Sequence, residues 1–146
     1  SKFAVLIKRT KHDKVFSDFI RHRDRWTCQR CGKVKNPMSP SSRKGLHCSH
    51  FYGRSTYATR FDSDNCVALC YGCHRYLGSH PAEHLEFITN HLGAERFREL
   101  TKRRNMKVKR RDFLNDHFYN ELQLMLEEIQ TPDYGPPYSM ANPTGN

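Results

Sequence analysis

Two pairs of cysteines have a spacing that binds metal ions. Each pair has the form Cys-x-x-Cys, and the pairs are Cys28 with Cys31 and Cys70 with Cys73. This spacing lets one tight turn direct two thiolates at a single ion, and two such turns complete the tetrahedral four-cysteine site of structural zinc. A redox pair and buried free thiols are the alternatives, but two pairs of matched spacing favour zinc. In a small core, that zinc would supply much of the folding free energy.

Three further polar residues follow in a fixed order along the same stretch. His50 comes first, Asn65 follows fifteen residues later, and His74 comes directly after the second cysteine pair. A neutral histidine, whose ordinary pKa is about 6.5, can take a proton from water at pH 7. Phosphodiester hydrolysis needs such a base, together with positive charge on the transition state that a divalent metal ion supplies. The residue types therefore suit metal-assisted hydrolysis.

The two remaining cysteines, Cys48 and Cys66, have no metal-binding pattern around them. We expect both to be small buried core residues, since free cysteine is among the residues most often buried. Cys48 lies two positions before His50, so a part in the histidine motif is the alternative for it.

The charge of the chain is concentrated in two segments. Its 146 residues include 25 Lys and Arg against 15 Asp and Glu, which gives a net charge of +10. Residues 1–60 carry a net charge of +12, and residues 101–111 hold seven basic residues and no acidic one. Two basic segments around a near-neutral centre suggest a polyanionic partner such as DNA. A solvated charged surface is the alternative.

The apolar runs of the chain are short. The longest uninterrupted ones, residues 3–7 and 67–71, have five residues each. A membrane span needs about 20 apolar residues, so a transmembrane protein is excluded and we expect no membrane partner. The first run is also too short for the apolar part of a signal peptide. We therefore expect a soluble, intracellular protein whose reduced cysteines bind metal.

Helical periodicity marks both ends of the chain. Residues 13–24 place apolar side chains on one stripe, with Asp13 as the expected N-cap. Near the other end, Asp112 should open a helix in which apolar residues recur as far as Ile129. Residues 131–146 hold four Pro and two Gly without a periodic pattern, and we expect a disordered tail. The sequence therefore predicts one domain, residues 1–130, followed by this tail.

The centre of the chain predicts a hairpin followed by helices. Residues 46–52 and 57–61 could be short strands, with a turn around residues 53–55. A helix should begin at Pro81 and stop at Gly93, and a second short helix should follow it. The residues expected to point inward from these two helices are Leu85, Ile88, Leu92, Phe97 and Leu100.

Residues 15–104 resemble the HNH endonuclease family. The order His50, Asn65, His74 carries this resemblance together with the two Cys-x-x-Cys pairs. A closer similarity is to phage recombination proteins of the NinG/Rap type and to related prophage HNH proteins. It is carried by residues 19–25, 49–52, 60–65 and 92–97. The resemblance implies a phage or prophage protein that acts in the cytoplasm of a bacterial host cell.

The resemblance also implies a fold and roles for the motif residues. The fold is α+β, with a small ββα-metal (HNH) core and a four-cysteine zinc ribbon, flanked by N- and C-terminal helices. In that fold a β-hairpin carries the first histidine and a helix carries the last. His50 matches the general base. Asn65 and His74 match the positions that hold or orient one catalytic divalent ion, Mn²⁺ or Mg²⁺.

One position departs from the family. Many HNH enzymes have a metal-binding carboxylate directly before the first histidine, where this chain has Ser49. NinG-like proteins instead have an aspartate three positions before that histidine, where this chain has His47. His47 is therefore our candidate for the missing ligand. The catalytic site would then use nitrogen rather than oxygen donors, which suits Mn²⁺, Co²⁺ or Ni²⁺ better than Mg²⁺.

Basic residues near the motif are candidates for contacts with the DNA backbone. Arg54, Arg60 and Arg75 lie close in sequence to the motif and could clamp a phosphate. For each of them, a solvated side chain is the alternative. The second basic segment adds six candidates for phosphate contacts: Lys102, Arg103, Arg104, Lys109, Arg110 and Arg111.

These observations predict a divalent-metal-dependent HNH endonuclease that nicks or cuts DNA. The resemblance suggests branched recombination intermediates as the substrate and other phage recombination proteins as partners, and it allows a homodimer. One alternative is a zinc-ribbon DNA-binding accessory protein with an inactive HNH site. A small packaging factor that nicks DNA at a terminus is another alternative, and it would share the chemistry.

Overall fold

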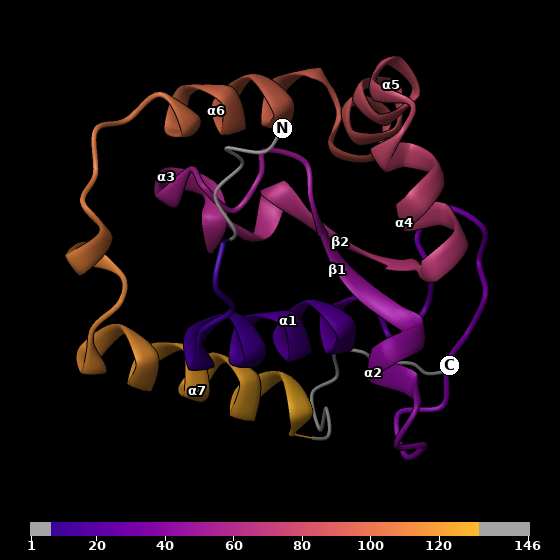
Figure 1. Cartoon of the computed structure of the whole chain (residues 1–146), viewed down its shortest axis with the longest axis horizontal. Helices are drawn as coiled ribbons and strands as arrows, with labels where there is room; N and C mark the ends of the chain where they lie inside the picture. Colours follow the sequence, from indigo (N-terminus) through magenta and orange to yellow (C-terminus); the bar gives the residue numbers. More distant parts are fainter. Residues whose placement is uncertain (1–6, 132–146) are drawn as a thin grey trace, which may run out of the picture.

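The computed structural model describes residues 7–131, in which helices surround a two-stranded antiparallel sheet (Figure 1). The elements, with η for a 3-10 turn, are α1 (Lys11–Arg23), α2 (Ser42–Gly45), β1 (Leu46–His50), α3 (Tyr57–Arg60), η1 (Ser63–Asn65), β2 (Cys66–Cys70), α4 (Tyr71–Gly78), α5 (Pro81–Leu92), α6 (Ala94–Arg104), η2 (Arg110–Asp112) and α7 (Asp116–Gln130). The predicted α+β class is confirmed. Apart from its first residue, the predicted tail lies outside the described residues.

The sheet pairs β1 with β2, and α4 follows β2 directly. The register runs from Leu46 opposite Cys70 to His50 opposite Cys66. The predicted second strand, residues 57–61, is wrong, because residues 57–60 form the helical turn α3 instead. The segment that pairs with β1 is buried along its whole length, as expected for a continuous apolar run covered on both faces.

Helix α1 begins with a capping box. The Thr10 hydroxyl accepts a hydrogen bond from the Asp13 N–H, and the Asp13 carboxylate accepts one from the Thr10 N–H. The N-cap is therefore Thr10, and the prediction of Asp13 for that position is wrong by one turn. An aspartate at the third helical position also accepts a hydrogen bond from a backbone N–H at the start of the helix. Its residue type alone therefore does not distinguish it from an N-cap.

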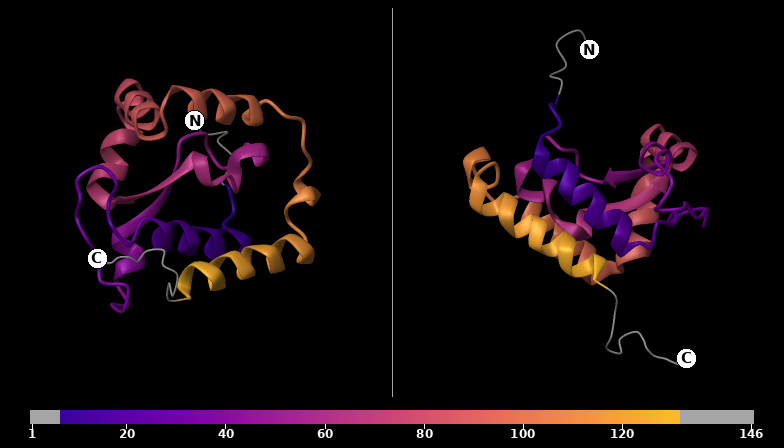
Figure 2. Two further views of the ribbon diagram at one scale, coloured as in Figure 1. Left: turned by 180° about the vertical axis from the view of Figure 1, so that it is seen from behind. Right: turned by 90° about the horizontal axis from the view of Figure 1, so that it is seen from below.

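Helix α7 returns to cover α1, and the two lie side by side in Figure 1 and in the right-hand view of Figure 2. Leu122 of α7 packs with Phe16 and Ile20 of α1 in one buried cluster. The Asn115 side chain caps α7 by accepting a hydrogen bond from the Phe118 N–H at 2.8 Å. The predicted start at Asp112 is wrong, because that residue lies in the separate turn η2.

Helices α5 and α6 lie on the opposite side of the sheet from α1 and α7 (Figure 1), where α5 contacts α4 and α6 contacts α3 and η1. Pro81 is the first residue of α5, and Gly93 separates the two helices with a φ of +87°, as expected for glycine. Ile88, Leu92 and Leu100 are buried as predicted, whereas Leu85 is exposed. No helix among residues 7–131 is both long and apolar enough to cross a membrane.

Candidate functional site

The structure brings the four cysteines of the two pairs together. Their sulfur atoms all lie within 4.8 Å of one another, and the Sγ atoms of Cys31 and Cys70 are 3.8 Å apart. Tetrahedral zinc with Zn–S bonds of about 2.3 Å places its sulfurs about 3.8 Å apart. The cluster Cys28, Cys31, Cys70 and Cys73 is therefore compatible with structural zinc.

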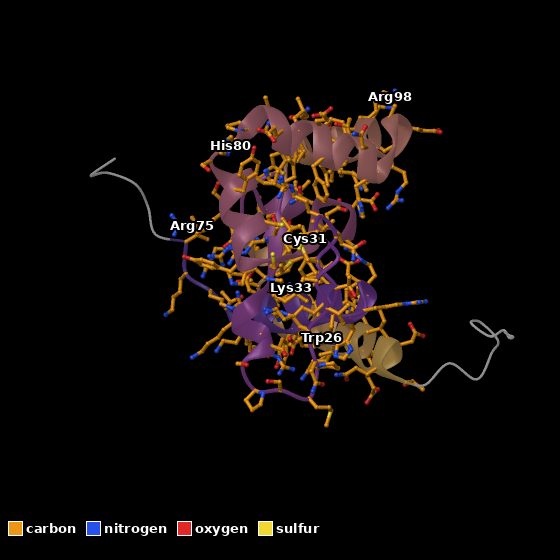
Figure 3. All side chains as sticks on the ribbon, turned by 90° about the vertical axis from the view of Figure 1, so that its right-hand side faces the viewer. Trp26, Cys31, Lys33, Arg75, His80 and Arg98 are labelled. Carbon is orange, nitrogen blue, oxygen red and sulfur yellow. The ribbon has the colours of Figure 1, made fainter. Side chains whose placement is uncertain are left out.

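Two different turns present these cysteines. The first is a tight hairpin in which the Cys28 N–H donates to the Lys33 carbonyl at 2.8 Å and Gly32 adopts a φ of +80°. In the second, Cys70 ends β2 and caps α4, and Cys73 lies in the first turn of that helix. Figure 3 shows Cys31 and Lys33 near the centre of this side of the molecule. One pair thus needs a left-handed glycine and the other uses a helix start.

Hydrogen bonds favour the thiolate at Cys28, whereas burial raises the pKa of the Cys73 thiol to about 12. Burial alone would raise the pKa of Cys28, but backbone N–H groups of Cys31, Cys70 and Arg30 outweigh it and lower this pKa to about 6. The Arg30 guanidinium also donates to the Cys73 sulfur at 3.4 Å and lies over the Tyr76 ring. Thiolate is the form that binds metal, so the surroundings of Cys28 suit a metal site.

Histidines of the motif line a separate cavity of about 770 Å³. His47, His50 and His74 all line it. Its walls come from α1, the α2–β1 segment, the loop after β1 and α4. Two acidic residues also line it, against six basic ones: Arg9, Lys14, Arg21, Arg43, Lys44 and Arg54. The cavity is therefore positively charged and suits an anionic ligand.

His50 is the last residue of β1, and one of its ring nitrogens already forms a hydrogen bond. Its Nε2 lies 2.9 Å from the Arg60 carbonyl oxygen. A carbonyl only accepts hydrogen bonds, so Nε2 carries the proton and Nδ1 keeps the lone pair. Burial lowers the pKa of His50 to about 4, helped by the positive charge of Arg54. His50 is thus neutral at pH 7, with one fixed tautomer.

His47 and His74 face each other across β1 and α4. Their Nδ1 atoms are 2.8 Å apart, and the Nε2 of His47 lies 2.8 Å from the Lys44 carbonyl oxygen. That carbonyl fixes the proton on Nε2 and leaves the lone pair of His47 on Nδ1, beside His74. Burial lowers the pKa of His74, and the nearby charge of His47 adds to this effect. The His74 ring therefore favours the neutral form that binds metal.

Asn65 does not fit its predicted part in holding the metal. Its side chain is fully buried, and its Oδ1 accepts a hydrogen bond from the Tyr52 N–H at 2.8 Å. Its Nδ2 donates to the carbonyls of Tyr52 and Thr59. Both donors and the oxygen are used on backbone groups, so Asn65 instead fixes the loop between β1 and α3. That loop leads to the Arg60 carbonyl that orients His50.

Arg60 does not fit its predicted role as a phosphate clamp. Its side chain is only 2% exposed, and it forms an ion pair with Asp13 at 2.6 Å. The same guanidinium also donates to the Lys8 carbonyl. Arg54 does line the cavity, where it contacts Asp13 at 3.6 Å. Among the three arginines singled out by sequence, Arg54 alone reaches the cavity.

The remaining predicted contacts lie elsewhere. Arg75 is exposed on the outer surface of α4, where it donates to the Tyr71 hydroxyl (Figure 3). The basic segment 101–111 is divided between the end of α6, an irregular stretch and η2, and none of its residues lines the cavity. Arg103 is engaged by Asp62 at 2.6 Å and by Asp64 at 3.3 Å, which ties α6 to η1.

Sequence reasoning missed the basic residues that do line the cavity beside Arg54. They come from α1 and from the segments before α1 and β1, and they are Arg9, Lys14, Arg21, Arg43 and Lys44. The strong positive charge of residues 1–60 was the available signal. It could not identify these five, because their convergence depends on α1 packing against β1.

Cys48 and Cys66 pack with α1 and α7 in the cluster that contains Phe16. Cys66 is buried, as predicted, and Cys48 is half-buried at the edge of the cavity. No family model matches the chain, and neither a curated protein nor a solved structure does.

Proposed function

We propose that the protein is a divalent-metal-dependent HNH endonuclease that hydrolyses DNA phosphodiester bonds. The observation that carries this proposal is the state of His50, which is neutral and held in one tautomer at the wall of a positively charged cavity. The motif order of the sequence and the succession of two strands and a helix support it.

His50 would act as the general base. With the Nε2 proton held by the Arg60 carbonyl, the Nδ1 lone pair is the one that can take a proton from water. Asn65 and the Arg60–Asp13 ion pair would be positioning groups, because they fix the backbone whose Arg60 carbonyl orients the His50 ring. The hydroxide formed in this step would attack phosphorus, the bond from phosphorus to the leaving oxygen would break, and that oxygen would take up a proton from water.

His47 and His74 would hold the divalent ion. Two nitrogen ligands at right angles, each about 2.1 Å from a metal ion, lie about 3.0 Å apart, close to the 2.8 Å between the two Nδ1 atoms. The Lys44 carbonyl orients His47 from behind, as backbone carbonyls commonly do for metal-binding histidines. A bound ion would supply positive charge to the scissile phosphate.

The DNA backbone would lie against the basic rim of the cavity. Arg9, Lys14 and Lys44 are exposed there and are free to approach phosphates. Arg21 and Arg43 are instead held by Asp18 at 2.7 and 2.8 Å. Arg54 lines the cavity with His50, and its positive charge acts on that ring. Phosphate contacts of this kind position DNA without reading its sequence.

One observation favours a second function, a zinc-ribbon DNA-binding protein with an inactive site. Ser49 stands where many HNH enzymes have a carboxylate ligand, and it is only 2% exposed. The two acidic residues of the cavity, Asp13 and Asp18, are held in ion pairs with arginines. A site without a free carboxylate binds Mg²⁺ poorly, so DNA binding without cleavage is the alternative outcome.

A plasmid-nicking assay separates the two functions. Wild type should nick supercoiled DNA with Mn²⁺ and be inactive with EDTA, and His50→Ala should lower the rate by about 100-fold or more. His117→Ala is the matched control, since that histidine is exposed on α7. DNA binding without nicking by wild type under all metal conditions would support the second function instead.

The choice of metal tests the nitrogen ligands separately. Wild type should nick faster with Mn²⁺, Co²⁺ or Ni²⁺ than with Mg²⁺ at equal concentration, because imidazole suits these ions better. His47→Asp should shift the preference towards Mg²⁺, as it exchanges a nitrogen ligand for an oxygen. Full Mg²⁺ activity in wild type would contradict the assignment of His47 and His74.

A further inference from the structure

A second group of metal-binding side chains lies apart from the four-cysteine cluster. The Sγ atoms of Cys48 and Cys66 and a ring nitrogen of His50 all lie within 4.8 Å of one another. We call these three residues the thiol–histidine group. Neither the four-cysteine cluster nor the His47–His74 pair includes Cys48 or Cys66.

The strand register explains why these three side chains converge. Cys48 and His50 are alternate residues of β1, so they point to the same face of the sheet. Cys66 begins β2 directly opposite His50. Helix α1 covers this face with Phe16 and Ile20, which belong to the same packed cluster as the two cysteines. The thiol–histidine group is therefore formed by the sheet and enclosed by the helix.

The donor set suits a thiophilic cation. Two sulfurs and one imidazole nitrogen match a three-ligand zinc site with one open position, which water can fill. The Arg60 carbonyl holds the Nε2 proton of His50, so Nδ1 is the nitrogen with a lone pair for an ion. Two thiolates balance the charge of a divalent ion, so the filled site is neutral and its burial costs less.

Solvent reaches the group through the cavity. Cys48 and His50 both line the cavity, while Cys66 is buried behind them. An ion can therefore enter from the cavity and meet all three donors. Both cysteines are free in the structure, with no disulfide between them.

We propose that Cys48, His50 and Cys66 bind a thiophilic cation such as Zn²⁺ and that this ion inhibits the protein. The inhibitory part rests on the proposed function, because a nitrogen of His50 bound to an ion cannot take a proton from water. Excess zinc would then inhibit hydrolysis by occupying the general base His50. The zinc in the four-cysteine cluster would continue to stabilise the fold.

Binding is tested with Co²⁺ added anaerobically to protein that carries one zinc per chain. Co²⁺ binds more weakly than Zn²⁺ and should leave the four-cysteine cluster filled. Wild type should develop the charge-transfer absorption of thiolate-bound Co²⁺ with about one equivalent, and Cys48→Ser and Cys66→Ala should lose it. His47→Ala is the control and should retain it, because His47 contributes no sulfur.

Two results would overturn the binding proposal. One is the same absorption in wild type and in Cys48→Ser, which would place the Co²⁺ at the four-cysteine cluster. The other is an absence of thiolate absorption in wild type with both thiols free. If wild type instead shows a mass two hydrogens lower and no Co²⁺ binding, the two cysteines form a redox pair and the metal assignment is wrong.

Inhibition is tested in the nicking assay with Mn²⁺ and increasing Zn²⁺. Cys48→Ser should nick like wild type without added zinc and need at least about tenfold more Zn²⁺ for half inhibition. Equal zinc sensitivity of the two proteins would overturn the inhibitory role. If wild type never nicks DNA, the proposed function fails, while the Co²⁺ result still decides whether the site exists.

Discussion

The two ends of the β1–β2 sheet are held in different ways. At one end, where Leu46 pairs with Cys70, two short turns place four cysteines around one point. At the other, where His50 pairs with Cys66, buried hydrogen bonds from Asn65 and the Asp13–Arg60 ion pair fix the backbone. Each cysteine pair depends on the spacing within one turn, and a hydrogen bond from the Gln29 N–H to the Ala68 carbonyl joins the first turn to β2. The histidine end depends instead on several side chains that come from distant parts of the chain.

This difference implies different weak points. Removing one ligand of a closed metal site removes most of its binding energy, and in small domains that energy is folding energy. Removing one member of a buried hydrogen-bond network leaves its partners unsatisfied, at a cost of a few kcal/mol. The cysteine end should therefore decide whether the chain folds, and the histidine end should decide how the site is shaped.

The largest effect should follow from Cys70→Ser. The loss of one thiolate opens the metal site, and we expect the domain to lose its zinc and its cooperative unfolding transition. Metal analysis and circular dichroism measure the two effects. Cys48→Ser, outside the four-cysteine cluster, is the control and should keep one zinc per chain. A Cys70→Ser protein that melts like wild type would show that the cluster is not structural.

Asp13→Ala should have the next largest effect. It leaves the buried Arg60 charge without its partner, which typically costs about 3–5 kcal/mol of the free energy of unfolding. Denaturant unfolding measures the loss. Asp116→Ala is the matched control, since Asp116 contacts Lys11 at 3.8 Å on an exposed surface, and its unfolding midpoint should barely move.

The same ion pair predicts a pH dependence. Burial alone would raise the pKa of Asp13, but hydrogen bonds from Arg60 and Thr10 outweigh it and lower this pKa below its ordinary value. A lowered pKa in the folded state gives stability that is present above about pH 4, the ordinary aspartate value, and is lost as pH falls through the folded pKa. The stability difference between wild type and Asp13→Asn should therefore shrink in acid. A constant difference from pH 7 to pH 3 would contradict this account.

Asn65→Ala should cost less, about 2–3 kcal/mol, because it leaves one buried N–H and two carbonyls without their partner. Asn65→Asp is the informative comparison, since it keeps the acceptor for the Tyr52 N–H and loses both donors. Nicking should fall in both variants while one zinc per chain remains. A loss of zinc together with activity would mean that the two ends of the sheet are not independent.

The smallest effects on the fold should come from surface charge. Reversing Arg9, Lys14 and Lys44 to Glu should weaken DNA binding about tenfold or more and lower its salt dependence. The same reversal at Lys109, Arg110 and Arg111 should have a smaller effect, because those residues lie outside the cavity. Affinity measured at several salt concentrations compares the two triplets. Equal losses would indicate that DNA covers both surfaces.

The sequence by itself determined the turn of each cysteine pair and most of the helices, while the packing of the first turn against β2 brings the two pairs together. Each Cys-x-x-Cys pair is presented by one local turn, and the periodicity of α1, α5 and α6 reflects faces that any compact fold must bury. Pro81 and Gly93 act through their own backbone preferences, so their positions could be predicted without the rest of the chain.

Only the tertiary structure decided how the histidine end is built. Residues 57–60 form a turn rather than a strand because β2 takes the place beside β1. The buried Arg60 side chain pairs with Asp13, 47 positions away. The Asn65 side chain forms hydrogen bonds with two backbone segments. Spacing along a chain describes contacts within one turn. Contacts between distant segments depend on which faces pack together, and packing is a property of the whole fold.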